Sequence, residues 1–188
     1  MGAIVQVNGY ENNWQRNADV VVLADGSVVV TYDSYINEYD DGFSGTVVLA
    51  QRFDRTGNRI GDETVIAAGD GTTSSDARTT ALSDGGYVVA WEYDDYDDIL
   101  TTQRRVYVQA FDADGTARGI ATRVDQLDAD DAVLPEVFAT AGGGYKVVFG
   151  ATGVNDPTYD AQQVYSQQFS ASGAKIGGNV LVNINEGE

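Results

Sequence analysis

Short apolar segments, each broken by a glycine turn, recur along the 188-residue chain. Residues 22–32 (VLADGSVVVTY), 81–91 (ALSDGGYVVAW) and 139–149 (ATAGGGYKVVF) each place an Asp-Gly or Gly-Gly pair between two apolar runs. Such pairs accept the positive φ angles of tight turns, so each segment predicts a β-hairpin. Only two prolines occur, and no segment shows the apolar period of a helix. The pattern predicts an all-β fold.

The hairpins belong to a longer repeat. Phe53, Phe111 and Phe169 lie 58 residues apart, and glycines at 57, 115 and 173 keep the same spacing. A fixed period of this length is typical of repeat architectures. We therefore expect a single repeat domain over residues 1–188, with units at about 3–67, 68–125 and 126–185.

Each unit predicts four antiparallel strands. The strands are apolar on both faces, which is typical of a β-propeller blade packed between two neighbours. Residues 3–8 resemble residues 179–183, so we expect three blades plus one extra N-terminal strand. Three blades are fewer than the usual minimum, so either a second chain completes the ring as a homodimer or neighbouring repeats of a longer chain do. The alternative is a β-sandwich or an open stack of sheets.

Composition removes several classes of function. The net charge of −18, from 29 acidic and 11 basic residues, disfavours nucleic acid and anionic membranes as partners. No apolar run is long enough to cross a bilayer, and the N-terminal residues lack a signal-peptide hydrophobic region. Without cysteine or histidine, thiolate zinc sites and histidine-based triads are excluded. Catalysis would have to rest on carboxylates, tyrosines, lysines or arginines.

The repeat resembles a known class of modules. Residues 82–91, 106–119 and the pair Val182-Asn183 carry a pattern similar to the propeller-type repeats of large secreted calcium-binding RTX proteins and adhesins of bacteria. The resemblance covers nearly the whole chain. It implies an extracellular or cell-surface repeat module, often non-catalytic, exported here without a recognisable N-terminal signal. The RTX nonapeptide that binds calcium does not occur in the sequence, so its calcium chemistry is not implied.

In a blade, the long loops between second and third strands share one face with the links between blades. We expect Asp33, Asp125 and the stretch Glu92–Asp98 to leave the sheets onto this acidic face, while Trp91, like Tyr32 and Phe149, stays in the core. Clustered carboxylates suit Ca²⁺. The predicted calcium ligands are Asp40, Asp41, Asp94, Asp95, Asp97 and Asp98.

Aromatic side chains are expected on the same face. A ring can cover the apolar side of a sugar while carboxylates bind its hydroxyls. The predicted ligand-binding residues are Trp14, Tyr35, Tyr39, Tyr93, Tyr96 and Tyr159. The alternative is a solvated loop face whose charge only keeps the protein soluble.

Three functions are compatible with this pattern. The first is a non-catalytic extracellular binding or structural module that recognises a glycan or a surface protein, with Ca²⁺ as a candidate cofactor. The second is a glycoside-processing enzyme with its carboxylate pair among residues 94–98 and 128–131. These acids are adjacent in sequence rather than arranged as one pair with separated pKa values, which favours the first function. The third is an architectural spacer.

Overall fold

The computed structural model describes residues 4–9, 14–37, 44–68, 73–98, 101–127, 131–152 and 162–183. For residues 37, 44, 95–98, 101 and 102 it describes the backbone only. These residues form twelve strands in three four-stranded antiparallel sheets, and none of them is helical. The prediction of an all-β fold is confirmed.

Each sheet follows the order of the chain. The first consists of β1 (Gln15–Val22), β2 (Val28–Asn37), β3 (Ser44–Phe53) and β4 (Arg59–Ala67). The second consists of β5 (Thr73–Ala81), β6 (Tyr87–Asp98), β7 (Thr101–Phe111) and β8 (Thr122–Arg123). The third consists of β9 (Asp131–Ala139), β10 (Tyr145–Thr152), β11 (Gln163–Phe169) and β12 (Lys175–Leu181).

Glycines with positive φ close the predicted hairpins. Gly26, Gly85 and Gly143 have φ of 81°, 92° and 84° at the turn between the first two strands of each sheet. The Gly26 N–H donates to the carbonyl of Leu23 at 2.9 Å, and the other two turns repeat this bond. A side chain is disfavoured at such φ, which explains why the turn position is glycine in every unit.

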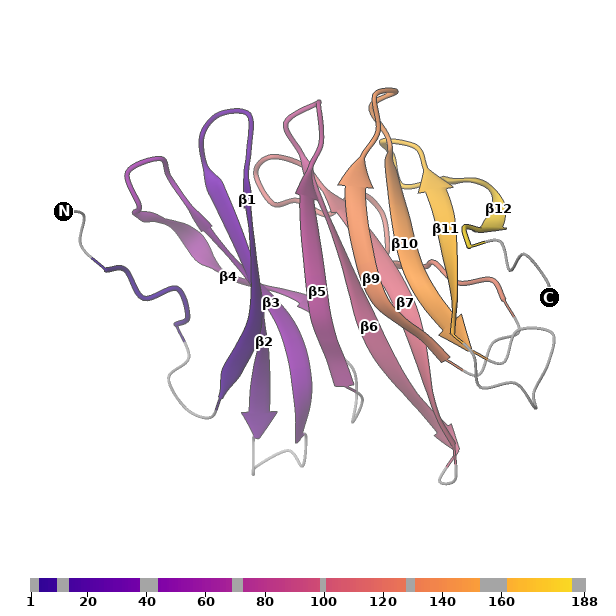
Figure 1. The fold of residues 1–188 in the computed structure, drawn as a ribbon. Helices are drawn as coiled ribbons and strands as arrows, with labels where there is room; N and C mark the ends of the chain where they lie inside the picture. Colours follow the sequence, from indigo (N-terminus) through magenta and orange to yellow (C-terminus); the bar gives the residue numbers. More distant parts are fainter. Residues whose placement is uncertain are drawn as a thin grey trace.

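The three sheets stack face to face in chain order, with β1, β5 and β9 side by side along one edge (Figure 1). Alternate residues of a strand point to opposite faces. We call the face that carries Tyr32, Trp91 or Phe149 the front face of its sheet, and the opposite one the back face. The back face of each sheet packs on the front face of the next, so the second sheet is covered on both sides.

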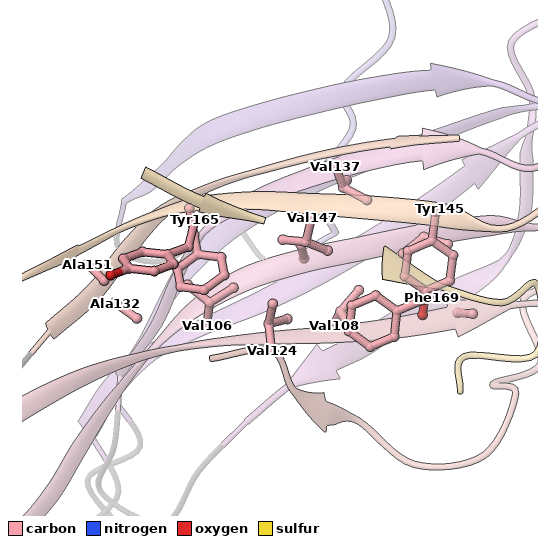
Figure 2. Packing of buried hydrophobic residues seen from close by; sticks show 14 of the residues in the cluster. Val106, Val108, Val124, Ala132, Val137, Tyr145, Val147, Ala151, Tyr165 and Phe169 are labelled. Carbon is pink, nitrogen blue, oxygen red and sulfur yellow. The ribbon is translucent and has the colours of Figure 1, made fainter. Parts of the chain in front are cut away.

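Aromatic pairs organise both interfaces. Between the second and third sheets, Tyr145 and Phe169 stack with ring centroids 4.9 Å apart against valines that include Val108 (Figure 2). Between the first and second sheets, Tyr87 and Phe111 stack at the same distance. Both pairs are buried, so the two interfaces use one packing scheme.

The prediction of an extra N-terminal strand is wrong for residues 4–8, which the structure describes and which belong to no sheet. They lie on the front face of the first sheet, where Val7 packs on Tyr32, Val47 and Leu49. The Arg59 guanidinium binds the carbonyls of residues 6 and 7, at 3.2 and 2.8 Å. These carbonyls are thus satisfied by a side chain instead of a strand ladder.

The expectation that Glu92–Asp98 leave the sheet is also wrong. The strand β6 continues to Asp98, and Asp94 pairs with Arg104 of β7. Opposite charges on neighbouring strands favour this pairing, which explains why a run of acids stays in a ladder.

Three acids expected on the exposed face are buried instead, namely Asp33, Glu92 and Asp125. Each carboxylate is held by donors from the protein. Asp125, for example, accepts from the Arg123 guanidinium and from the Val106 N–H, the latter at 3.1 Å. Buried carboxylates require such donors, and sequence position alone does not reveal them.

Candidate functional site

Three positions on the front face of the second sheet differ from their counterparts in the third. Cross-strand pairing places Ser74 opposite Tyr93 and Trp91 opposite Tyr107. The counterparts in the third sheet, paired in the same way, are Ala132 with Ala151 and Phe149 with Tyr165. The backbone frame is therefore the same, while the second sheet carries a serine hydroxyl, an indole and an extra phenol ring.

These four residues line an open cleft of about 270 Å³ between the first two sheets. Trp91 and Tyr107 stack at 6.1 Å between ring centroids, and Tyr93 meets Tyr107 edge-on at 5.3 Å. The opposite wall is aliphatic. It is formed by Ile66, Ala67 and Ala68 at the end of β4, with Ala121 completing the lining. The cleft thus has one aromatic wall and one small apolar wall.

Two polar atoms at this cleft are buried and have no hydrogen-bond partner in the described part of the chain. They are the indole Nε1 of Trp91 and the hydroxyl oxygen of Ser74, in residues that are 3% and 1% exposed. An unmet buried donor costs about 1–3 kcal/mol. The third sheet carries Phe149 and Ala132 at the equivalent positions and avoids this cost. The backbone at these two positions therefore accommodates apolar side chains. Because both atoms are buried, a ligand that offers an acceptor to the indole and a hydroxyl to the serine would reach them only after side chains of the cleft wall move.

A buried carboxylate lies in the same interface. Asp33 is cross-strand to Val48, which pairs with Ala67 of the cleft wall. Its Oδ2 accepts from Asn17 Nδ2 at 2.8 Å and from the Asp76 N–H at 3.3 Å, while Oδ1 has no partner. Burial raises the pKa of Asp33 to about 6, against these hydrogen bonds, which lower it.

Two of the predicted ligand-binding residues, Trp14 and Tyr35, lie together at the start of the first sheet. Their rings stack at 5.4 Å and 18°. The Arg16 guanidinium carbon is 4.4 Å from the centre of the indole. Trp14 keeps 44% of its surface exposed, but its neighbours already use part of the ring. Neither residue lines the cleft.

The remaining predicted residues are placed as follows. Tyr93 lies in the cleft, and Asp94 lies in β6 opposite Arg104. For Asp95, Tyr96, Asp97 and Asp98 only the backbone in β6 is described. Tyr39, Asp40, Asp41 and Tyr159 lie outside the described residues. Among the residues the structure describes, no group of three or more acidic side chains is gathered as metal ligands.

Asp131, from the second predicted carboxylate run, is bound to Arg104. Its oxygens accept from the Arg104 N–H at 2.9 Å and from the guanidinium at 2.8 Å. Burial acts to raise the pKa of Asp131, but these bonds outweigh it, and the pKa lies below its usual value. The carboxylate is therefore ionised and engaged in a structural ion pair.

Sequence reasoning missed Ser74, Trp91 and Tyr107 as candidate ligand contacts. The repeat position that Trp91 shares with Tyr32 and Phe149 predicts a core residue, and Trp91 is indeed buried. The sequence signal for these residues lies in a change of residue type at equivalent positions of the repeat, and not in the positions themselves. Within one repeat frame, serine replaces alanine, and tryptophan replaces phenylalanine, at adjacent points of one face.

No protein-family model matches the chain, and no curated protein matches it in sequence. The described part of the chain has no helix long and apolar enough to span a membrane.

Proposed function

We propose that the chain is a non-catalytic carbohydrate-binding module of a secreted or cell-surface protein, with its sugar site in the cleft formed by Trp91, Tyr93, Tyr107 and Ser74. The observation that carries this proposal is the pair of unpartnered buried atoms, Trp91 Nε1 and Ser74 Oγ, beside three aromatic rings. A sugar ring offers an apolar face to aromatic side chains and hydroxyls to a donor and an acceptor.

The size of the cleft limits the ligand. At about 270 Å³ it lies just below the usual range of about 300–1,000 Å³ for ligand pockets. It therefore suits one sugar ring, the rest of a glycan lying outside the cleft. Selectivity would come from the spacing between the Trp91 N–H and the Ser74 hydroxyl.

The chemistry of the lining supports binding rather than hydrolysis. Glycoside hydrolysis uses two carboxyl groups that flank the bond to be cleaved. The described residues that line the cleft include no aspartate or glutamate. A glycoside-processing activity is the alternative, and chromogenic glycosides would detect it.

A propeller-like arrangement is part of the proposal. Stacked four-stranded sheets whose first strands lie side by side, as β1, β5 and β9 do, are what blades around an axis require. The resemblance to RTX-like repeats supports an extracellular setting. An open stack or a sandwich is the alternative, and small-angle scattering of the purified chain would separate these shapes.

Calcium binding by residues 94–98 stays a prediction of the sequence. A rise in melting temperature of several degrees at submillimolar Ca²⁺, lost in the Asp94→Asn plus Asp97→Asn variant, would support it. An unchanged melting temperature would remove it.

The proposed function is tested by a glycan array followed by calorimetric titration of any ligand found. Ser74→Ala and Tyr93→Ala introduce the residues that the third sheet carries, so both changes are compatible with the frame. We expect each to weaken binding by about tenfold, the effect of one lost hydrogen bond or ring contact. Trp14→Ala, at a residue that does not line the cleft, is the control and should leave binding unchanged. Unchanged affinity in both cleft variants would overturn the proposal.

A further inference from the structure

Residues 4–9, which we call the strap, lie on the front face of the first sheet without joining it (Figure 1). The strap residue Val7 packs on a floor of three buried side chains, namely Tyr32, Val47 and Leu49. None of the three described sheets packs against this face of the first sheet. The strap is therefore what covers the centre of the face.

The strap holds the place that a fourth strand holds on the front faces of the other two sheets. In each unit, the apolar residue 25 positions before the front-face aromatic residue packs on that face, namely Val7 for Tyr32, Ile66 for Trp91 and Val124 for Phe149. Its carbonyl is bound in the same way in two of the units. The Val7 carbonyl accepts from Arg59 Nη2 at 2.8 Å. The Val124 carbonyl accepts from Nζ of Lys175, which stands two repeat periods after Arg59, at 3.3 Å.

The strap differs from these two fourth-strand segments in its backbone support. Ile66 lies in β4, which is hydrogen-bonded to β3 of its own sheet. The Val124 N–H donates to the Val106 carbonyl at 2.7 Å and so ties this segment to β7. The residues of the strap belong to no sheet. The strap thus occupies the position of a strand without the ladder that fixes a strand in place.

Two charged side chains of β4 anchor the strap. The Arg59 guanidinium binds the carbonyls of residues 6 and 7, and Glu63 Oε1 accepts from the Gly9 N–H at 2.6 Å. The strap does not fill the face, because an open pocket of about 310 Å³ lies between it and the first two strands. A segment held by few contacts opens at a lower free-energy cost than the sheets beneath it.

We propose that the front face of the first sheet is a groove for an extended peptide, and that the strap is its built-in, releasable occupant. The floor of the groove takes one apolar side chain, at the position of Val7. Arg59 binds two main-chain carbonyls of the peptide, and Glu63 binds an N–H two residues beyond the apolar side chain. Main-chain hydrogen bonds with a side-chain pocket are a common way to bind extended peptides. The proposal does not rest on the glycan cleft, which lies on the second sheet.

Thiol labelling of the full chain tests whether the strap opens by itself. The chain has no cysteine, so a single introduced cysteine reports its own exposure. Leu49→Cys lies under the strap, whereas Val48→Cys, on the opposite face of the same strand, lies in the interface with the second sheet. We expect Leu49→Cys to react at least about tenfold faster than Val48→Cys in native buffer, and both to react equally in denaturant. Equal native rates would mean that the strap opens only when the whole chain unfolds, which overturns the proposal.

A second set of measurements tests the anchor. Adding Arg59→Ala should speed the labelling of Leu49→Cys by about tenfold and leave that of Val48→Cys unchanged, because charge-assisted hydrogen bonds to the strap are lost. Arg55→Ala, at an exposed residue in the turn before β4, is the matched control. Val47→Cys, also under the strap, takes the place of Leu49→Cys if that variant does not fold. Equal acceleration of both cysteines by Arg59→Ala would contradict the proposal.

A peptide added to the full chain tests the groove itself. A capped peptide of residues 4–9 (IVQVNG) binds the groove whenever the strap is open, so it should slow the labelling of Leu49→Cys in a saturable way. The same six residues in scrambled order should not. Labelling that the peptide leaves unchanged would show that the face does not bind extended peptides.

Discussion

The indole of Trp91 stacks on the ring of Tyr107 with centroids 6.1 Å apart and planes 22° apart, and its repeat counterpart, Phe149 on Tyr165, has nearly the same geometry at 6.2 Å and 26°. The same stacked arrangement of two rings thus occurs in the second and the third sheet, and only the pair in the second sheet carries an indole N–H. Since Nε1 has no partner among the residues that the structure describes, the stacked rings explain why an aromatic ring is present at position 91 but not why it is an indole. A ligand that accepts a hydrogen bond supplies the missing reason.

Trp91→Phe tests this directly, because Phe149 shows that the position accepts phenylalanine. We expect the free energy of unfolding to change by less than about 1 kcal/mol, since removing an unmet donor offsets the lost ring area. Glycan affinity should fall about tenfold. Chemical denaturation and calorimetric titration measure the two quantities. Trp91→Ala is the control, with an expected loss of about 3–5 kcal/mol from the cavity. Equal destabilisation by both changes would contradict the account.

Ser74→Ala removes a buried hydroxyl that has no partner. We expect it to stabilise the chain by about 1 kcal/mol, because the desolvation cost of the hydroxyl disappears. Ser27→Ala is the matched control. Ser27 is also buried, but its hydroxyl donates to Asp25 Oδ1 at 2.6 Å, so its loss should cost about 1 kcal/mol. Urea unfolding gives both values, and a loss of stability in Ser74→Ala would mean that its hydroxyl is satisfied in the free protein.

Adjacent glycines in one turn should respond differently to alanine. Gly143 has φ of 84°, whereas Gly142 has no positive φ and open space around its Cα. Gly143→Ala should destabilise the chain by about 1–2 kcal/mol, the cost of a left-handed alanine. Gly142→Ala should be neutral or stabilising by a few tenths of a kcal/mol, since it restricts only the unfolded chain. Thermal melts of the two variants distinguish them, and equal losses would contradict the turn geometry.

The buried carboxylate of Asp33 predicts a pH dependence. Its pKa in the folded chain is raised to about 6 from an ordinary value of 3.8, so the folded state binds more protons between these values. Its stabilising contribution is therefore fully present below about pH 4 and is lost as the pH rises through about 6. Burial also raises the pKa of Glu92, in the same direction.

We expect the free energy of unfolding of the wild type to fall between pH 4.5 and 7.5, and Asp33→Asn to flatten this dependence. Denaturant titrations at several pH values measure it. Asp54→Asn is the control, because hydrogen bonds from Thr56 and Asn58 lower the pKa of that exposed carboxyl, and its titration falls below this range. A wild-type profile that rises with pH, or that Asp33→Asn leaves unchanged, would contradict the assignment.

The strands and their turns could be predicted because short apolar runs and glycine turns with positive φ are local properties. The burial of Asp33 and Glu92 could not, because it depends on the N–H groups of Asp76 and Leu134 in the following sheet. The extension of β6 through Asp98 was hidden for a similar reason, since its partner Arg104 lies across the hairpin.

The cleft is an intermediate case. Aligning the repeats places Ser74 against Ala132 and Tyr93 against Ala151, so the chemical difference is readable in the sequence. What the sequence does not show is that Trp91 Nε1 and the Ser74 hydroxyl are left without partners. Burial and hydrogen bonding in three dimensions decide that point.

The most direct measurement uses Trp91 as its own reporter. The chain has two tryptophans, so Trp14→Phe leaves Trp91 as the single tryptophan, whose emission is excited selectively at wavelengths that tyrosine does not absorb. Titration of this variant with a glycan identified on the array should give a saturable change in emission with the dissociation constant found by calorimetry, and adding Ser74→Ala should shift that constant by about tenfold. If the glycan binds by calorimetry while the Trp91 emission and the Ser74→Ala constant stay unchanged, the ligand lies elsewhere and the cleft is not the site.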